Sequence, residues 1–407
     1  MALKVVPENQ QFIDALPQAL QSEVLDRLEA LMKLSNPVPW QQVDAQLQLI
    51  KVIAASPFSV QIFLLNPQLL DHALLTKRVS KPQLKRLLMA DMQEVTNETQ
   101  LHQSLRQFRK AHQVRLIWRN RCGLGSSEQL VEDLSNLADV CVDLALTWLH
   151  DDSVKQWGQP TNRDGQPQEL VVLGMGKLGG KELNLSSDID LIFSFPAPGE
   201  TQGGRRSLDN QQFFIRLGQR LIQAIDAVTA EGFVFRVDMR LRPYGASGAL
   251  ALSFDAMEIY YQQQGREWER YAFVKARVIA GNQAPGQQLL ELLRPFVYRK
   301  YLDYSAIESL RSLKQMIASE VRRRGLEQNV KLGTGGIREV EFIAQAFQLI
   351  RGGRDNRLQT SSLMAVLDVL PETAGLASSD VEKLRTGYWF LRDVEHALQA
   401  VHDKQTQ

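Results

Sequence analysis

The stretch from residue 170 to residue 195, which reads LVVLGMGKLGGKELNLSSDIDLIFSF, constrains the fold more than any other part of the chain. A short apolar run ends in a turn rich in glycine, and a second apolar run then begins around Asp188 and Asp190. Side chains of a strand alternate between its two faces, so these two carboxylates share one face while Ile189 and Leu191 turn to the core. The pattern therefore predicts two strands joined by a glycine turn, with paired carboxylates at one edge.

Two carboxylates held close together raise each other's pKa unless a cation neutralises them. Hard oxygen ligands without a nearby His or Cys favour Mg²⁺ over zinc or copper, and Mg²⁺ usually binds substrate phosphate oxygens as well. This stretch therefore predicts phosphoryl or nucleotidyl transfer at a magnesium site.

Residues 234–242, VFRVDMRLR, offer a third carboxylate. Apolar residues at the odd positions and arginines around Asp238 at the even positions predict a half-buried strand with one cationic face. Beside the first strand, Asp238 would complete a cage of three catalytic, metal-binding carboxylates, Asp188, Asp190 and Asp238, for two metal ions. Arg240 and Arg242 share the face of Asp238, where they either bind phosphate oxygens or only balance the carboxylates.

The glycine turn has two interpretations. In the first, its glycines only allow a tight connection between a strand and a helix. In the second, which we favour, Gly174, Gly176 and Lys177 bring the backbone close to nucleotide phosphates, with Ser186 or Ser187 as a further phosphate or ribose contact. The stretch lacks the long βαβ setting of a dinucleotide fingerprint.

Two later stretches carry further candidates. Residues 265–281 concentrate charged side chains, among which Lys275 and Arg277 either face the cleft or, as we slightly favour, have a structural role. In residues 331–342, KLGTGGIREVEF, glycines precede a predicted helix, an arrangement whose free amides attract phosphate. One interpretation is a capped helix start in which Arg338 pairs with Glu341. The other is that side chains of this run reach the active cleft: Arg338, Glu339 or Glu341.

Apolar periodicity divides the chain into three predicted regions. Helical spacing followed by a polar stretch with Pro and Gly predicts an N-terminal helical domain with a linker over residues 1–168. Residues 169–255 predict a small α/β core with helices on one side of a mixed sheet, and its polar loop at 196–206 suits a mobile flap over the site. Helical patterns return over residues 256–407 and stop abruptly, which predicts a truncated C-terminal helical domain.

Composition narrows the function classes. The formal net charge of +1 gives no general attraction to polyanions, so arginines spread around the predicted helix at 101–121 indicate a solvated or ion-paired face, with Phe108 and Trp118 in the core. No run reaches the length of a membrane span, and no apolar signal segment opens the chain. Cys122 and Cys141 lack metal or redox spacing. We therefore expect a cytoplasmic protein without nucleic-acid or membrane partners.

The order of these features resembles the polymerase-β type nucleotidyltransferase fold: a glycine turn, an Asp-x-Asp strand and a lone Asp on a later strand. Longer sequence motifs resemble a narrower family, the bifunctional enzymes that adenylylate and deadenylylate glutamine synthetase. These motifs are GMGKLGGKELNLSSDIDL, FRVDMRLRPYGASGAL and KLGTGGIREVEFIAQ. The resemblance is to the amino-terminal, adenylyl-removing half and covers nearly all 407 residues.

The resemblance implies an α+β, mostly helical fold in which a small mixed sheet forms a nucleotidyltransferase core flanked by N- and C-terminal helical regions. It implies phosphorolysis, in which inorganic phosphate removes AMP from a tyrosine of adenylylated glutamine synthetase and leaves as ADP. It also implies control by the uridylylated PII signal protein. Because the family's adenylylating half is absent, we expect no adenylylation by this chain alone.

Two other function classes remain open at the level of the sequence. A different nucleotidyltransferase, such as a uridylyltransferase or an RNA nucleotide-adding enzyme, would share the three aspartates. A catalytically silent regulatory module that only docks partners would not need them.

Overall fold

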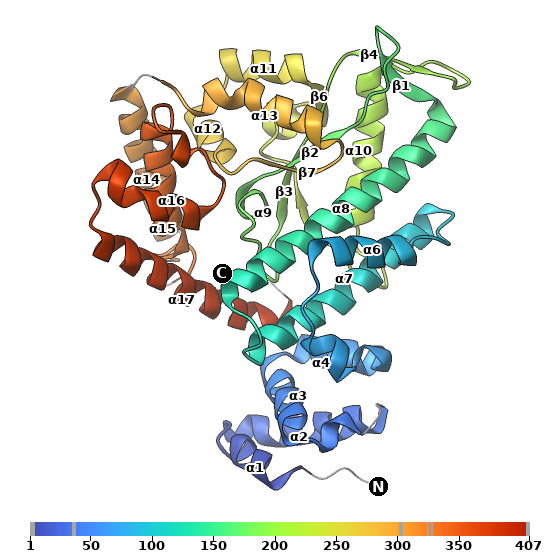
Figure 1. Cartoon of the computed structure of the whole chain (residues 1–407), viewed down its shortest axis with the longest axis vertical. Coiled ribbons are helices and arrows are strands. Elements are labelled where there is room, and N and C mark those ends of the chain that lie inside the picture. Colours follow the sequence, from blue (N-terminus) through green and yellow to red (C-terminus); the bar gives the residue numbers. More distant parts are fainter. Residues whose placement is uncertain (1–4, 35–37, 301–303, 324, 327–328, 404–407) are drawn as a thin grey trace.

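The structure is a computed structural model of the chain, and it describes residues 5–34, 38–300, 304–323, 325–326 and 329–403. Figure 1 shows the N-terminal helices at the bottom, a small sheet at the top, and a group of C-terminal helices at its side. The fold is mostly helical around this mixed sheet, which confirms the predicted α+β class.

The N-terminal region is helical, as the sequence predicted. Its first helices pack around Trp40, Ile50 and Phe63, together with Trp118 from a later helix. Phe108 and Trp118 are both buried, as expected. The α-helices of this region are α1 (Pro7–Asp14), α2 (Gln18–Leu34), α3 (Val43–Ala55), α4 (Pro57–Leu65), α5 (His72–Thr76), α6 (Lys81–Asp91), α7 (Glu98–Arg121) and α8 (Ser127–Trp157).

No single helix of the described residues is long and apolar enough to cross a membrane. Within the described part of the chain, α3 and α4 are the one pair that passes such a test together, by length and composition, and they are bent by 112° at the break between them. Short 3₁₀ helices lie at Pro39–Gln41, Pro67–Leu69, Gly245–Ser247 and Asn356–Leu358.

The arginines of α7 confirm only part of the predicted solvated or ion-paired face. Arg106, Arg109 and Arg115 are buried, so this part of the helix is not a solvated face. Arg106 donates hydrogen bonds to backbone carbonyls, including that of Gly232 at 2.9 Å, and Arg109 pairs with Asp403 at 2.7 Å. The guanidinium groups of Arg106 and Arg109 are buried because they satisfy carbonyl and carboxylate oxygens where segments far apart in the sequence meet.

The central sheet is small and mixed, as predicted. β2 (Val171–Gly174) pairs antiparallel with β3 (Ile189–Phe195) and with β7 (Arg277–Ala280). The short strands β5 (Val237–Asp238) and β6 (Ala251–Ser253) both pair parallel with β3. The sheet therefore takes one strand, β7, from beyond residue 255, where the sequence predicted only helices.

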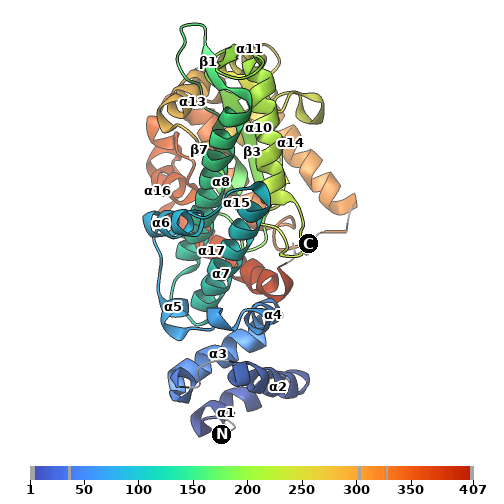
Figure 2. The same cartoon turned by 90° about the vertical axis from the view of Figure 1, so that its right-hand side faces the viewer.

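Helices cover both faces of the sheet, so the predicted one-sided arrangement was wrong. α8 and α10 (Asn210–Asp226) pack on one face and lie side by side (Figure 2), while α11 (Phe254–Gln263) and α13 (Gln283–Val297) pack on the other. Neighbouring residues of β2 enter different cores, Val172 on the side of α8 and Val171 on the side of α13. A strand that is apolar on both faces needs a cover on each.

The predicted linker and the predicted flap pair with each other. β1 (Gln159–Asn162) and β4 (Gly199–Gln202) form a separate antiparallel two-stranded sheet. The loop at 196–206 follows the end of β3 that is opposite to Asp190, and Figure 1 shows β1 and β4 at the top of the molecule, away from α9 (Gly176–Gly179) near its middle. This loop therefore does not cover the carboxylates.

The C-terminal helices form a further group with its own core, which includes Leu367 and Tyr388. This core is built mainly by α15 (Ile337–Arg351), α16 (Leu363–Ala374) and α17 (Ser378–His402), while α12 (Glu267–Phe273) and α14 (Tyr304–Arg323) pack beside α15. α14 lies in the region where the sequence predicted helices, and most of its apolar side chains lie outside the described residues. α17 also contacts α4 and α8, so it reaches back to the N-terminal helices.

Candidate active site

The three predicted aspartates line one cleft of about 980 Å³ between the sheet and the C-terminal helices. Asp190 on β3 is the direct register partner of Asp238 on β5, and neighbouring strands lie about 4.8 Å apart. Asp188 precedes β3 by one residue and also lines the cleft, while Ile189 and Leu191 are buried in the core. The predicted gathering of the three carboxylates at one edge is therefore confirmed.

The strand of Asp238 is much shorter than predicted. Only Val237 and Asp238 are in the ladder, whereas the alternating pattern predicted a strand over residues 234–242. The Asp238 carboxylate accepts a hydrogen bond from the backbone N–H of Arg240 at 2.8 Å, and such a local bond turns the chain out of the sheet.

Arginines hold two of the three carboxylates. Arg236 pairs with Asp188 at 2.7 Å, and Arg240 pairs with Asp238 at 2.5 Å. Burial works to raise the pKa of Asp238, but the hydrogen bonds and charge of Arg240 keep this pKa below its ordinary value. For Asp190, burial and then the charges of Asp238 and Asp188 raise the pKa to about 6.

The predicted metal cage is not closed in this structure. Among the described residues, no three His, Cys, Asp or Glu side chains are arranged to hold a metal ion. The physical reason is the pairing with Arg236 and Arg240, whose guanidinium groups supply the positive charge that adjacent carboxylates need. The donor set nevertheless fits a hard cation, since three carboxylates gather on one cleft wall and burial, followed by the charges of Asp238 and Asp188, raises the pKa of Asp190.

The glycine turn places backbone against the carboxylates. Gly176 has a φ of +52°, and a Cβ at this position would lie 2.9 Å from the Oδ2 atom of Asp190. A Cβ on Gly179 would lie 1.8 Å from the carbonyl oxygen of Lys275. Glycine is therefore required here by both conformation and space.

Cations form another part of the cleft wall. Lys177, Lys331 and Arg338 line it, and so does Lys275. Burial, followed by the charge of Arg392, lowers the pKa of Lys177 to about 7, while Glu395 opposes this shift from 3.2 Å. The cleft thus presents carboxylates and cations to the same space, an arrangement that suits a phosphate ester with its counter-ions.

Lys275 is the centre of a buried ion group. Its Nζ atom lies 2.5 Å from the carboxylate of Glu182 and 3.3 Å from that of Glu341. Burial opposes the charge of Lys275, but the two carboxylates hold its pKa above the ordinary value. Glu341 pairs with this lysine, whereas the sequence suggested a pair with Arg338.

The other predicted site residues divide into two groups. Residues of the first group line the cleft: Ser187, Lys275, Arg338, Glu339 and Glu341. Residues of the second group lie outside its lining. Gly174 would place a Cβ 2.6 Å from Ile279 inside the sheet. Ser186 is buried and accepts a hydrogen bond from Arg236.

Two predicted cations also have partners away from the cleft. Arg242 donates to the backbone carbonyls of Met239, Ala246 and Gly248, and so holds its own loop together. Arg277 pairs with Asp139 at 2.8 Å and donates to the carbonyls of Leu178 and Gly179, so it supports the glycine turn from below. For Arg277 the structural interpretation is confirmed.

The sequence did not single out several residues that the structure brings to the cleft. Lys331 is the first residue of the KLGTGG run and lines the cleft, whereas the sequence singled out only the glycines of this run. An aromatic and apolar part of the wall comes from Trp268, Tyr271, Leu241 and Phe342. Trp268, Tyr271 and Phe342 lie on α12 and α15, which approach the sheet only through tertiary packing, so no local sequence signal marks these three residues.

Comparisons with known proteins agree with this site. Residues 46–292 match the family model described as glutamate-ammonia ligase adenylyltransferase, and this match contains all three aspartates. Residues 311–407 match the model described as GlnD PII-uridylyltransferase.

Curated proteins named bifunctional glutamine synthetase adenylyltransferase/adenylyl-removing enzyme are also similar. That of Pseudomonas putida is 53% identical over 408 residues, covering 99% of this chain and 40% of that protein. The Pseudomonas aeruginosa protein is 59% identical over 326 residues, covering 80% of this chain and 33% of that protein. The Shewanella woodyi protein is 48% identical over 398 residues, covering 96% of this chain and 41% of that protein. The chain thus spans between one third and about two fifths of the length of these relatives.

Proposed function

Because the chain belongs to the glutamate-ammonia ligase adenylyltransferase family, we propose that it carries the adenylyl-removing site of a bifunctional enzyme. Its proposed substrate is glutamine synthetase that bears an adenylyl group on a tyrosine. The names of the similar proteins include this activity. The assignment to the amino-terminal half rests on the sequence motifs that resemble the adenylyl-removing half of the family.

The observation that carries the proposal is the gathering of Asp188, Asp190 and Asp238 in a cleft that is also lined by cations. These three carboxylates would hold Mg²⁺, in place of the guanidinium groups that now neutralise two of them. When bound there, a pair of such ions supplies positive charge around the attacking and leaving oxygens of an in-line displacement.

The proposed reaction is phosphorolysis. An oxygen of inorganic phosphate attacks the phosphorus of the adenylyl group, the bond from phosphorus to the tyrosyl oxygen breaks, and the phenolate takes up a proton. The products are ADP and unmodified tyrosine. A phenol with a pKa of about 10 is a tolerable leaving group, and phosphate is already anionic, so the reaction requires no dedicated general base.

The residues of this chain bind and orient the anions. Lys177, Lys331 and Arg338 offer donors to phosphate oxygens at the cleft wall. Trp268, which is 38% exposed, offers an aromatic face beside them that suits the adenine ring. Uridylylated PII is proposed as a partner from the family resemblance.

The decisive experiment incubates the chain with adenylylated glutamine synthetase, Mg²⁺ and inorganic phosphate. We expect ADP in solution and loss of the adenylyl group from the tyrosine, measured by chromatography and by mass spectrometry of the substrate. Asp190→Asn should lower the rate at least about a thousandfold, while Asp164→Asn, at an exposed turn, should leave it unchanged. Release of AMP without phosphate, or full activity of the Asp190→Asn variant, would refute the proposal.

A second candidate function follows from the match of residues 311–407 to the PII-uridylyltransferase model. This match covers most of α14 and all of α15 to α17. It contains none of the three aspartates, so it adds to the adenylyl-removing proposal and does not contradict it. The same assay distinguishes the two. Transfer of UMP from UTP to PII by this chain, without ADP release from adenylylated glutamine synthetase, would favour the second candidate.

A further inference from the structure

The loop of residues 176–188 carries Lys177 at its start and Asp188 at its end, and it joins β2 to β3. We propose that contacts from α17 position this loop, and that Glu395 is a positioning residue which orients Lys177 toward the incoming phosphate. The role assigned to Lys177 rests on the proposed function. The contact between α17 and the loop does not.

Three side chains of α17 contact the loop from one face of the helix. Arg392, Glu395 and Gln399 follow a spacing of three and four residues, which places them in one row. All three are buried, with exposed fractions of 0%, 4% and 3%. A buried polar row on a helix persists only where partners satisfy it.

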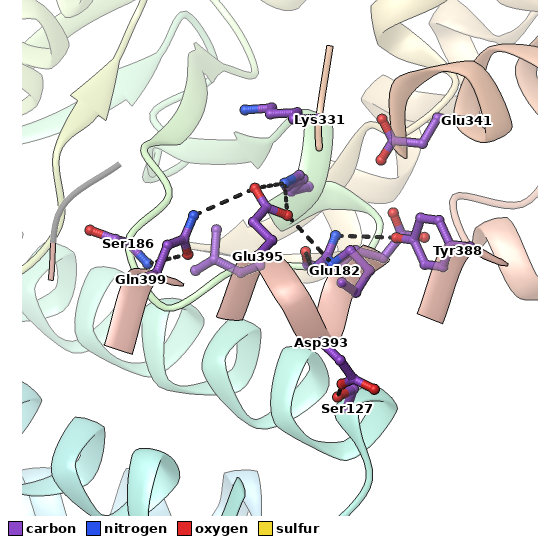
Figure 3. A network of polar contacts seen from close by, with 12 residues as sticks. Ser127, Glu182, Ser186, Lys331, Glu341, Tyr388, Asp393, Glu395 and Gln399 are labelled. Atoms are coloured by element: carbon purple, nitrogen blue, oxygen red, sulfur yellow. Dashed lines mark hydrogen bonds and ion pairs between the residues drawn. The ribbon is translucent and has the colours of Figure 1, made fainter. Parts of the chain in front are cut away.

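The partners of this row lie at successive points of the loop (Figure 3). Glu395 accepts from the Nζ atom of Lys177 at 3.2 and 3.3 Å. Arg392 donates to the backbone carbonyl of Glu182 at 2.7 Å. Gln399 accepts from the backbone N–H of Ser186 at 3.1 Å, two residues before Asp188. The helix therefore contacts the start, the middle and the end of the loop.

Glu395 controls where the charge of Lys177 lies. The Lys177 side chain is 12% exposed and lines the cleft, whereas Glu395 does not belong to the cleft lining. A buried ammonium group without a carboxylate partner loses its proton or moves to water. Glu395 thus opposes the loss of this charge and fixes the Lys177 amino group next to Gly176, where its remaining hydrogens can be donated toward the cleft.

The middle of the loop is fixed from two sides. The Glu182 carboxylate pairs with Lys275 at 2.5 Å and accepts from the backbone N–H of Leu363 at 3.0 Å, while its carbonyl accepts from Arg392. These contacts connect the loop to the turn before β7, to the start of α16 and to α17. The row on α17 is therefore part of a larger polar layer and not an isolated ion pair.

The test compares Glu395→Gln with Glu382→Gln, since Glu382 lies on the same helix with its side chain 69% exposed. In the ADP-forming assay, Glu395→Gln should raise the KM for inorganic phosphate about tenfold, the effect of losing one charge-assisted hydrogen bond, with kcat within about twofold. Glu395→Asp should restore part of this loss. Glu382→Gln should match the parent chain. An unchanged or lower KM in Glu395→Gln would overturn the proposal, because a lower KM would mean that Glu395 withholds Lys177 from phosphate.

Hydrogen exchange provides a readout that needs no catalysis. Amides of the loop of residues 176–188 should exchange faster in Glu395→Gln, and in Gln399→Met, than in the parent chain or in Glu382→Gln. Equal exchange in all four proteins would overturn the proposal. If the parent chain forms no ADP, the proposed function fails, and the exchange measurement still decides whether α17 positions the loop. If ADP forms but exchange and KM do not respond, only the positioning proposal fails.

Discussion

At the scale of single residues, the site depends on how each carboxylate is neutralised. Asp188 and Asp238 have arginine partners, while Asp190 lies between them and has a pKa of about 6 because of burial and the two neighbouring charges. Asp190 is therefore the carboxylate that gains most from a bound cation.

This difference gives a pH dependence for the binding of Mg²⁺. Below pH 6, Asp190 holds a proton in the metal-free protein, so the cation must displace that proton. The half-saturating Mg²⁺ concentration should rise about tenfold per pH unit below 6 and stay nearly constant above it. Titration calorimetry between about pH 7 and about pH 5 measures this, with Asp164→Asn as a control that should behave like the parent. Equal affinity at both ends would contradict it.

The sequence predicted the carboxylates well because alternation along a strand is a local property. It predicted less of the cation set, because Arg242 and Arg277 share faces and spacing with site residues yet donate to backbone carbonyls elsewhere. Lys331 shows the reverse case, since its place in the cleft depends on how the loop before α15 packs against the sheet.

At the scale of elements, the turn between β2 and α9 determines how closely the backbone approaches Asp190. Gly176 and Gly232 both have positive φ angles, of +52° and +81°. Only Gly176 has a carboxylate oxygen within reach of an added Cβ, whereas a Cβ on Gly232 would have nothing within 4 Å. The two positions therefore separate the cost of conformation from the cost of the close approach.

Gly232→Ala should lower the free energy of unfolding by about 1 kcal/mol and leave ADP formation intact, because it adds only conformational strain. Gly176→Ala should cost about 1–3 kcal/mol and also abolish activity, because its methyl group displaces Asp190. Urea unfolding and the ADP assay check both variants. An active Gly176→Ala chain would show that the turn does not control the carboxylate.

Element boundaries were the least predictable part of the fold. The pattern of residues 234–242 is that of a strand, but an Asp238 side chain that bonds the backbone of Arg240 ends the ladder after two residues. The sheet also recruits β7 from a region whose sequence reads as helical. Such pairings depend on distant partners, which a local pattern does not contain.

At the scale of the whole molecule, buried histidines make stability depend on pH. Burial, followed by the charge of Arg115, lowers the pKa of His112 to about 3, so this residue stays neutral in the folded protein where the unfolded chain takes up a proton below about pH 6.5. Stability is therefore lost as the pH falls from about 6.5 toward 3. Burial also lowers the pKa of further histidines in the same direction: His102, His150 and His396.

For His112 alone, the loss at pH 5 should be about 2 kcal/mol relative to neutral pH. In chemical unfolding, the free energy of unfolding of His112→Gln should decline less steeply between neutral pH and pH 5 than that of the parent chain. A His72→Gln chain provides a comparison at another histidine. A decline with the same slope in His112→Gln and the parent chain would contradict this account.

The segment that the sequence delimits as the α/β core, residues 169–255, should not fold alone. It lacks β7, which pairs with β2, and α8, which covers one face of the sheet. Circular dichroism and solubility should show an unfolded, aggregating fragment, since the fragment loses α8 from one face and α13 from the other, where Val171 and Leu173 would be exposed. A longer fragment, residues 98–300, keeps these elements and should retain the sheet. A soluble, folded 169–255 fragment would contradict this prediction.

α8 is a single helix of 31 residues that belongs to the helical region at one end and to the sheet at the other. Its buried Asp139 pairs both with Lys81 of α6 and with Arg277 of β7. Bending the molecule between these regions would require a break in the middle of the continuous helix α8. Any shift of α6 relative to the sheet would therefore have to break the two ion pairs that meet at Asp139.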